Sequence, residues 1–110
     1  MSQSEAGYTS VVPRLFLDVD PRTLRVPPSR PGRADPWKLH RQIAQFGRSA
    51  VGMPCPWVCR GTDAALLLYN GVTRATRIAK LAPGTLIRVE VVDDLKTSVG
   101  HLPTVGDLLP

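Results

Sequence analysis

Apolar and polar positions alternate in three stretches of the chain, and each stretch predicts a β-strand or a β-hairpin. In "RLFLDVDP", at residues 14–21, alternate positions are apolar and a proline follows, which is typical of a short strand. The segments "MPCPWVC" and "AALLLY" flank the polar turn "RGTD" and predict a hairpin over residues 53–69. In "TLIRVEVV", Ile87, Val89 and Val91 predict a final strand with one buried face.

Helical periods occupy two further segments. Residues 36–46 carry apolar side chains at helical spacing, with Asp35 before them as a typical N-cap and Gly47 after them as a typical C-cap. The second predicted helix covers residues 73–81 and ends before Pro83. The order of elements predicts a single small α+β domain with a mixed β-sheet and two packed helices.

The predicted domain covers residues 13–95, with a proline-rich loop inside it and a tail at each end. Residues 21–34, "PRTLRVPPSRPGRA", contain four prolines and four arginines, so we expect an extended, stiff and basic loop. Residues 1–12 are small and polar and predict a disordered N-terminal tail. Residues 96–110 have no sustained period, so we expect a loosely structured C-terminal tail.

Basic residues dominate the charge of the chain. Fourteen lysines and arginines against nine aspartates and glutamates give a formal net charge of +5, which favours phosphate-bearing or polyanionic partners. No apolar run approaches the roughly 20 residues that span a bilayer, and the N-terminus lacks the pattern of a signal peptide. We therefore expect a cytoplasmic protein with no membrane partner. The exposed edge of so small a sheet leaves a homodimer open.

The segment "YNGVTRATRIAK" joins a glycine turn to a basic helix start. Asn70 and Gly71 form the turn, Thr73 is placed to begin or cap the helix, and Arg74 lies in the first turn. The N–H groups of a helix N-terminus bind anions, and an arginine beside them holds a phosphate with two parallel hydrogen bonds. Arg77, one turn further on, is either a second anion ligand or a solvent-facing residue. In the plainer interpretation all these cations form the solvated face of an amphipathic helix.

Two cysteines invite a metal or redox interpretation, and the predicted strand argues against both. On a strand the Cα atoms of Cys55 and Cys59 lie about 13 Å apart, beyond the roughly 7 Å limit of a disulfide. Both thiols then share one face and belong to the core. His40 and His101 are too few further ligands to favour a structural zinc site.

Carboxylates for a metal-dependent enzyme are available on the last predicted strand and at strand ends, and an acid at a strand end is more often a turn or cap residue than a ligand. These are Asp18, Asp20, Glu90, Asp93 and Asp94. We therefore assign no metal ligand, and the catalytic residues of any enzyme remain unknown.

Most of the aromatic residues that could stack on bases are expected in the core: Tyr8, Phe16, Trp37, Phe46, Trp57 and Tyr69.

The order and spacing of these segments resemble the ParB/sulfiredoxin superfamily, which includes the ParB-like nuclease domains. The ending "LLLYNGVTRATRIAKLAPGTLIRVEVV" resembles the family's strand, glycine turn, arginine-bearing helix and final strand. Upstream, "VDPRTLRVPPSRPG" and "GMPCPWVCRG" resemble its opening, so the resemblance covers roughly residues 14–93. It implies a ParB/sulfiredoxin-like fold that binds a nucleotide at the glycine turn. ParB proteins bind CTP and sulfiredoxins use ATP, so CTP or ATP with Mg²⁺ is the implied cofactor.

The resemblance carries over at some positions and fails at others. Gly71 and Arg74 match the phosphate-binding turn, whereas Thr73 stands where sulfiredoxins have histidine and ParB proteins have arginine. Val72 stands where sulfiredoxins carry the reactive cysteine and ParB proteins a glutamate, so sulfiredoxin chemistry is not expected. No helix-turn-helix follows, so a complete ParB partition protein is not expected either.

Three functions follow as hypotheses. The first is a nucleotide-binding or phosphate-binding domain that holds the anion at the Gly71–Arg74 turn. By the resemblance, either Arg30 or Arg33 of the proline loop lies beside the same phosphates. The second is a non-catalytic DNA-binding or other nucleic-acid-binding module, using the basic loop and the surfaces that carry Arg41, Arg48, Arg74 and Arg77. The third is a phosphotransferase or nuclease.

Overall fold

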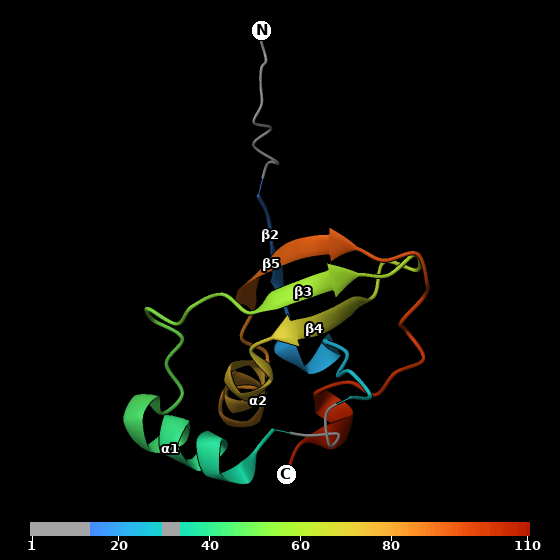
Figure 1. Cartoon of the computed structure of the whole chain (residues 1–110). Helices are drawn as coiled ribbons and strands as arrows, with labels where there is room; N and C mark the ends of the chain where they lie inside the picture. Colours follow the sequence, from blue (N-terminus) through green and yellow to red (C-terminus); the bar gives the residue numbers. More distant parts are fainter. Residues whose placement is uncertain (1–13, 30–33) are drawn as a thin grey trace, which may run out of the picture.

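The computed structural model describes residues 14–29 and 34–110 and shows a four-stranded sheet with two helices on one face (Figure 1). The sheet order is β2-β5-β3-β4, with β2 at Leu15–Val19, β5 at Ile87–Asp94, β3 at Trp57–Arg60 and β4 at Leu66–Asn70. β3 runs parallel to β5, and the other two pairings are antiparallel. This mixed sheet with its helices confirms the predicted α+β class. The tail expected at residues 1–12 lies outside the described residues.

The sheet face toward the helices carries the apolar positions that alternation predicts. Val89 of β5, Val58 of β3 and Leu68 of β4 are buried and form one core with Ile78 of α2 (Val72–Leu81). β3 begins at Trp57, later than the predicted start at residue 53. The prolines at 54 and 56 lack the N–H group that a ladder requires, which explains the late start.

The first predicted helix is confirmed with its caps. α1 covers Pro36–Phe46, and the Asp35 carboxylate accepts hydrogen bonds from the N–H groups of Trp37 at 2.9 Å and Lys38 at 3.3 Å. Gly47 is the C-cap, with a φ of +58°. α1 packs against α2 below the sheet (Figure 1).

α2 buries the apolar stripe that the sequence predicts. Ala75, Ile78 and Ala79 are all buried against the sheet. The helix begins at Val72, one residue earlier than predicted. In the described part of the chain, neither helix has the length and apolar character that crossing a membrane requires.

The proline-rich segment departs from the expected stiff loop. Its first residues form a short 3-10 helix, η1 (Pro21–Thr23), and Leu24 and Val26 are then almost fully buried in the core. Arg25, between them, forms β-bridges to Leu67 of β4 and to Thr104. Leu24, Arg25 and Val26 alternate apolar and polar side chains as a strand does. The prolines around them led to the prediction of a loop.

The C-terminal segment departs from the expected loose tail. Val99 and Val105 are 4% and 2% exposed, and the segment ends in a second 3-10 helix, η2 (Gly106–Leu108). The Val105 N–H donates to Leu24 O at 2.8 Å, which ties this segment to the proline-rich one. Separate tertiary contacts hold this segment in place. Such contacts leave no periodic pattern of apolar residues in the sequence, so the segment could not be recognised from it.

Candidate functional site

The N-terminus of α2 presents backbone N–H groups that no side chain caps. Gly71 is the N-cap residue, and the first helical bond runs from the Ala75 N–H to Gly71 O at 3.0 Å. The N–H groups of residues 72–74 therefore have no partner within the helix. The predicted capping role of Thr73 is wrong, because the helix starts before Thr73 and its side chain makes no cap bond. The positive end of the helix dipole stays open at this turn.

Gly71 is required by its own backbone and its neighbours. Its φ of +105° lies in the left-handed region, which L side chains rarely adopt. A Cβ atom there would lie 2.8 Å from Pro56 Cβ and 2.8 Å from Arg74 Nη2. The space beside Gly71 is thus filled by Pro56 and the Arg74 guanidinium, and it is not the route by which a ligand would approach the backbone.

Arg74 brings a poorly compensated cation to this turn. Its side chain is half-buried, and Nη2 lies 3.5 Å from Asn70 Oδ1, which is a long contact. Its Nε atom is buried without a hydrogen-bond partner, as are the Nε atoms of Arg25 and Arg77. Burial lowers the pKa of the Arg74 guanidinium. Among the described residues the ion pairs involve Arg14, Arg60 and Arg88, and none involves Arg74.

These groups line a cavity, which we call the anion pocket, of about 260 Å³. Its lining residues are Lys38, Gln42, Asn70, Gly71, Val72, Thr73 and Arg74. No acid is among them, so the anion pocket has a net positive lining. The structure thus brings together four residues predicted for the site: Asn70, Gly71, Thr73 and Arg74. Lys38 and Gln42, one helical turn apart on α1, were not predicted, because only the packing of α1 against α2 places them beside the turn.

Arg77 is neither of the two things that the sequence analysis allowed, a second ligand of the anion or a solvent-facing residue. Its side chain is 1% exposed, so it does not face bulk solvent. Its Nη1 donates to Gly47 O and Ser49 O, each at 2.8 Å, and its Nη2 lies 3.4 Å from the sulfur of Met53. The Cζ atom of the guanidinium also lies 5.3 Å from the centroid of the Phe46 ring. Arg77 therefore holds the segment after α1, at the negative end of that helix, and does not line the anion pocket.

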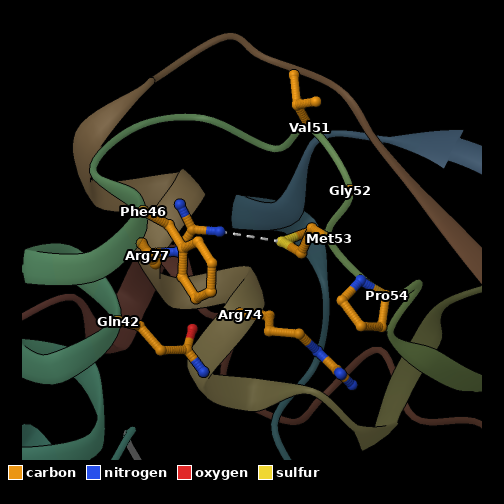
Figure 2. Close-up of a pocket in the computed structure, with 8 residues that line it drawn as sticks. All are labelled: Gln42, Phe46, Val51, Gly52, Met53, Pro54, Arg74 and Arg77. Atoms are coloured by element: carbon orange, nitrogen blue, oxygen red, sulfur yellow. Dashed lines mark hydrogen bonds between the residues drawn. The ribbon is translucent and has the colours of Figure 1, made fainter.

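A second cavity, which we call the loop pocket, adjoins the anion pocket and has a volume of about 220 Å³. Figure 2 shows its lining, with Gln42 and Phe46 from α1, Met53 and Pro54 from the following loop, and Arg74 reaching toward Pro54. Gln42 and Arg74 line both pockets. The Gln42 Oε1 atom is buried without a hydrogen-bond partner, so an acceptor stands free between the two cavities.

Two predicted site residues, Arg30 and Arg33, lie outside the described residues. The structure therefore does not place the arginine of the proline loop relative to the anion pocket.

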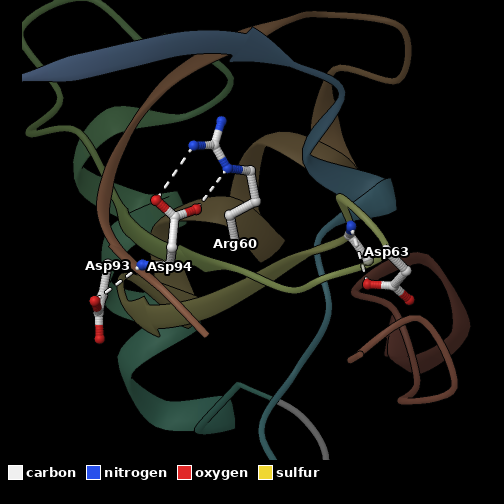
Figure 3. Close-up of polar contacts among 5 residues, drawn as sticks. Arg60, Asp63, Asp93 and Asp94 are labelled. Carbon is white, nitrogen blue, oxygen red and sulfur yellow. Dashed lines mark hydrogen bonds and ion pairs between the residues drawn. The ribbon is translucent and has the colours of Figure 1, made fainter. Parts of the chain in front are cut away.

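The acids considered for a metal site are engaged elsewhere. Glu90 forms an ion pair with Arg14, Asp18 with Arg88, and Asp94 with Arg60. In Figure 3 the Asp94 carboxylate faces Arg60, while the Asp93 side chain turns to the backbone of its neighbour. The fifth acid, Asp20, accepts a hydrogen bond from the Arg22 N–H at 3.0 Å. Within residues 14–29 and 34–110, no three His, Cys, Asp or Glu side chains gather as a metal site would require.

Asp63, which Figure 3 shows apart from these acids, organises the C-terminal segment. Its carboxylate accepts hydrogen bonds from the N–H groups of Gly100 at 2.8 Å and Val99 at 3.3 Å. Burial alone would raise the pKa of Asp63, but these backbone hydrogen bonds outweigh it and hold the pKa below its ordinary value. Asp63 is therefore a structural residue of the hairpin turn.

The cysteines also differ from their predicted arrangement. Cys55 is half-buried in the loop before β3, and Cys59 is buried on the strand, so the two do not share one face of a strand. Both thiols are free. Burial raises the pKa of the Cys59 thiol, with a smaller contribution from Asp93, so the thiol stays neutral near pH 7.

The expectation that most aromatic residues lie in the core is wrong for the described residues. Five of them are exposed by more than a third: Phe16, Trp37, Phe46, Trp57 and Tyr69. Tyr8 lies outside the described residues.

The chain was compared with known proteins by sequence. No protein-family model matches it, and no curated protein matches it.

Proposed function

We propose that this domain binds a phosphate-bearing ligand in the anion pocket, at the N-terminus of α2. The observation that carries the proposal is Arg74, which no carboxylate neutralises and whose guanidinium has one long contact, 3.5 Å from Asn70 Oδ1. It stands beside three backbone N–H groups with no partner in the helix. A dianionic phosphate satisfies all of these donors at once, because its oxygens accept bonds from N–H groups and from a guanidinium together.

The charges that line the anion pocket have no acid among them to compensate them, and this supports an anionic ligand. A cation in the first turn of a helix opposes the dipole, and Arg74 is desolvated as well. Lys38 adds a second positive charge from α1. Burial of a charge without a partner is costly, so such an arrangement is retained where binding an anion offsets it.

The ligand that fits best is a nucleotide. The loop pocket continues from the anion pocket through Gln42 and Arg74, and its lining includes Phe46, Met53 and Pro54. A base or sugar in the loop pocket would leave its phosphates at the N–H groups of α2. The resemblance to the ParB/sulfiredoxin superfamily points the same way, and it makes CTP or ATP with Mg²⁺ the first candidates. On this proposal the fold itself is ParB/sulfiredoxin-like.

The test is a thermal-unfolding and calorimetric titration of the whole chain with CTP, ATP, GTP and UTP, each with Mg²⁺. A ligand at a hundred times its dissociation constant stabilises the folded state by about 2.7 kcal/mol. Arg74→Ala removes a charge-assisted hydrogen-bonding group, so we expect affinity to fall roughly ten- to a hundredfold. The matched control is Lys80→Ala, which removes one positive charge from the exposed far end of the same helix and should leave affinity within about twofold.

Two results count against the proposal. One is the absence of any shift with all four nucleotides and with inorganic pyrophosphate at millimolar concentration. The other is equal loss of affinity in Arg74→Ala and Lys80→Ala, which would show that net charge and not the anion pocket determines binding. Far-ultraviolet circular dichroism of each variant verifies that the fold is retained.

A further inference from the structure

The outward face of α1 carries a large aromatic side chain that the fold does not use. Trp37 is 70% exposed at the start of the helix. Its ring stacks on His40, with ring centroids 6.2 Å apart and an angle of 19° between the planes. Both residues are exposed, so this aromatic pair is accessible from solvent. A tryptophan that is 70% exposed buries little of its ring in the core, so the ring is accessible to a partner.

Beside this aromatic surface runs a groove of positive charge. The groove has a volume of about 370 Å³ and is lined by Lys38, Arg41, Gln42, Gln45 and Phe46. No acid lines it, and among the described residues no ion pair engages Lys38 or Arg41. The one acid next to the helix, Asp35, is the N-cap and accepts backbone hydrogen bonds. The cations of α1 are therefore free to contact an anionic partner.

A second exposed aromatic pair among the described residues offers a contrast. Trp57 and Tyr69 stack on the outer face of the sheet, with centroids 6.3 Å apart. The three arginines paired with acids lie on sheet strands or just before them: Arg14, Arg60 and Arg88. The described cations of the sheet strands are thus paired with acids, whereas Lys38 and Arg41 of α1 are in none of these ion pairs.

We propose that the outward face of α1 binds a single-stranded polynucleotide. Unpaired bases stack on the rings of Trp37 and His40, and backbone phosphates lie along Lys38 and Arg41. A single strand is favoured over a duplex because only unpaired bases present a free π-face to a side chain. The chemistry is that of a strand-tracking surface without sequence readout, since stacking tolerates every base. Lys38 and Gln42 also line the anion pocket, so this surface adjoins the proposed nucleotide site, whereas Trp37 and Arg41 line neither pocket and distinguish the two.

The experiment measures fluorescence anisotropy of a labelled 20-nucleotide oligothymidine with the whole chain, from low to physiological salt. Trp37→Ala should weaken binding roughly five- to a hundredfold, the range for loss of one base–aromatic stack. The matched control is Tyr69→Ala, which removes an equally exposed aromatic ring from the sheet and should leave affinity unchanged. Arg41→Gln should lower the slope of log affinity against log salt by about one, whereas Arg60→Gln should not.

Three outcomes overturn the proposal. The first is an equal effect of Trp37→Ala and Tyr69→Ala on the oligonucleotide. The second is tighter binding of a duplex than of the single strand, with no effect of Trp37→Ala on either. The third is binding to vesicles of anionic phospholipid in the absence of any binding to the oligonucleotide, since a basic helix with an exposed tryptophan also suits a membrane surface.

The same variants separate this proposal from the proposed function. Trp37→Ala should keep the nucleotide-induced shift in melting temperature, because Trp37 does not line either pocket of the nucleotide site. Arg74→Ala should keep the oligonucleotide affinity while it loses the nucleotide. Loss of both ligands in both variants would show one shared site and refute a separate surface on α1.

Discussion

Replacement of Arg77 tests whether its buried guanidinium stabilises the fold by holding the segment after α1. We consider Arg77→Met, which keeps an unbranched apolar stem of similar length and removes the guanidinium. The two bonds from Nη1 to Gly47 O and Ser49 O, each 2.8 Å long, are lost, together with the contact to the Met53 sulfur. No new bulk enters the core, so the change reports on the polar contacts of a buried cation.

The magnitude follows from these contacts. A hydrogen bond from a charged donor contributes about 1.5–3 kcal/mol, so two contribute roughly 3–6 kcal/mol. Two effects oppose this loss. Burial lowers the pKa of Arg77, so removal of its charge relieves a desolvation cost, and Ser49 lies at the surface, where water replaces the lost donor. We therefore expect Arg77→Met to lower the free energy of unfolding by about 2–4 kcal/mol.

Urea unfolding followed by far-ultraviolet circular dichroism measures this change. The matched control is Lys80→Met on the same helix, where the lysine is exposed and makes one surface contact, to Pro110 O. We expect the control to stay within about 0.5 kcal/mol of the parent chain. If Arg77→Met lowers the free energy of unfolding by less than about 0.5 kcal/mol, the reasoning is refuted, because the hydrogen bonds of the buried guanidinium would then contribute no net stability. Arg77→Lys should fall between the two, since an ammonium keeps the charge but cannot span the same acceptors.

Three further substitutions test other parts of the fold by urea unfolding. Gly71→Ala should lower the free energy of unfolding by about 2 kcal/mol or more, because it adds a close contact with Pro56 to an unfavourable positive φ; Gly52→Ala, which has the positive φ and open space, should cost about 1 kcal/mol. Leu24→Ala should cost roughly 2–5 kcal/mol, as for a core leucine, and a cost near zero would contradict its burial. Asp63 has a lowered pKa in the folded state, so its stabilisation is present above the unfolded-state pKa of about 3.9 and is lost as pH falls through the folded-state value. The stability difference between the parent chain and Asp63→Asn should therefore shrink as the pH is lowered from 5 toward 3.

Periodic elements of the fold could be predicted because their signals are local. The alternation of Ile87 and Val89, and the cap at Asp35, depend only on neighbours in sequence, and the structure confirms the elements they predict. Leu24 and Val105 could not be placed in the same way. Their burial comes from contacts between the proline-rich and C-terminal segments, which no period along the chain records.

The candidate site was predictable in part for the same reason. The turn with Gly71 and Arg74 is a local motif, so the sequence located it. Lys38 and Gln42 belong to a different helix, and only tertiary packing brings them to the anion pocket. Arg77 was misplaced because helical spacing assigns it to the polar face, whereas the loop after α1 folds over that face and covers it.

Arg74 and Arg77 are one turn apart on the same helix, and the difference between them carries the functional argument. Arg77 is the more deeply buried, yet the carbonyl groups of Gly47 and Ser49 meet its charge at the negative end of α1. Arg74 has only a long contact to Asn70 and stands at the positive end of α2, where its charge is least favoured. If both arginines were structural, both should find acceptors within the chain. The Nε atom of each is buried without a partner, but the two 2.8 Å bonds of Arg77 Nη1 have no counterpart at Arg74, and we therefore propose that an anionic ligand in the anion pocket supplies the acceptor that Arg74 lacks.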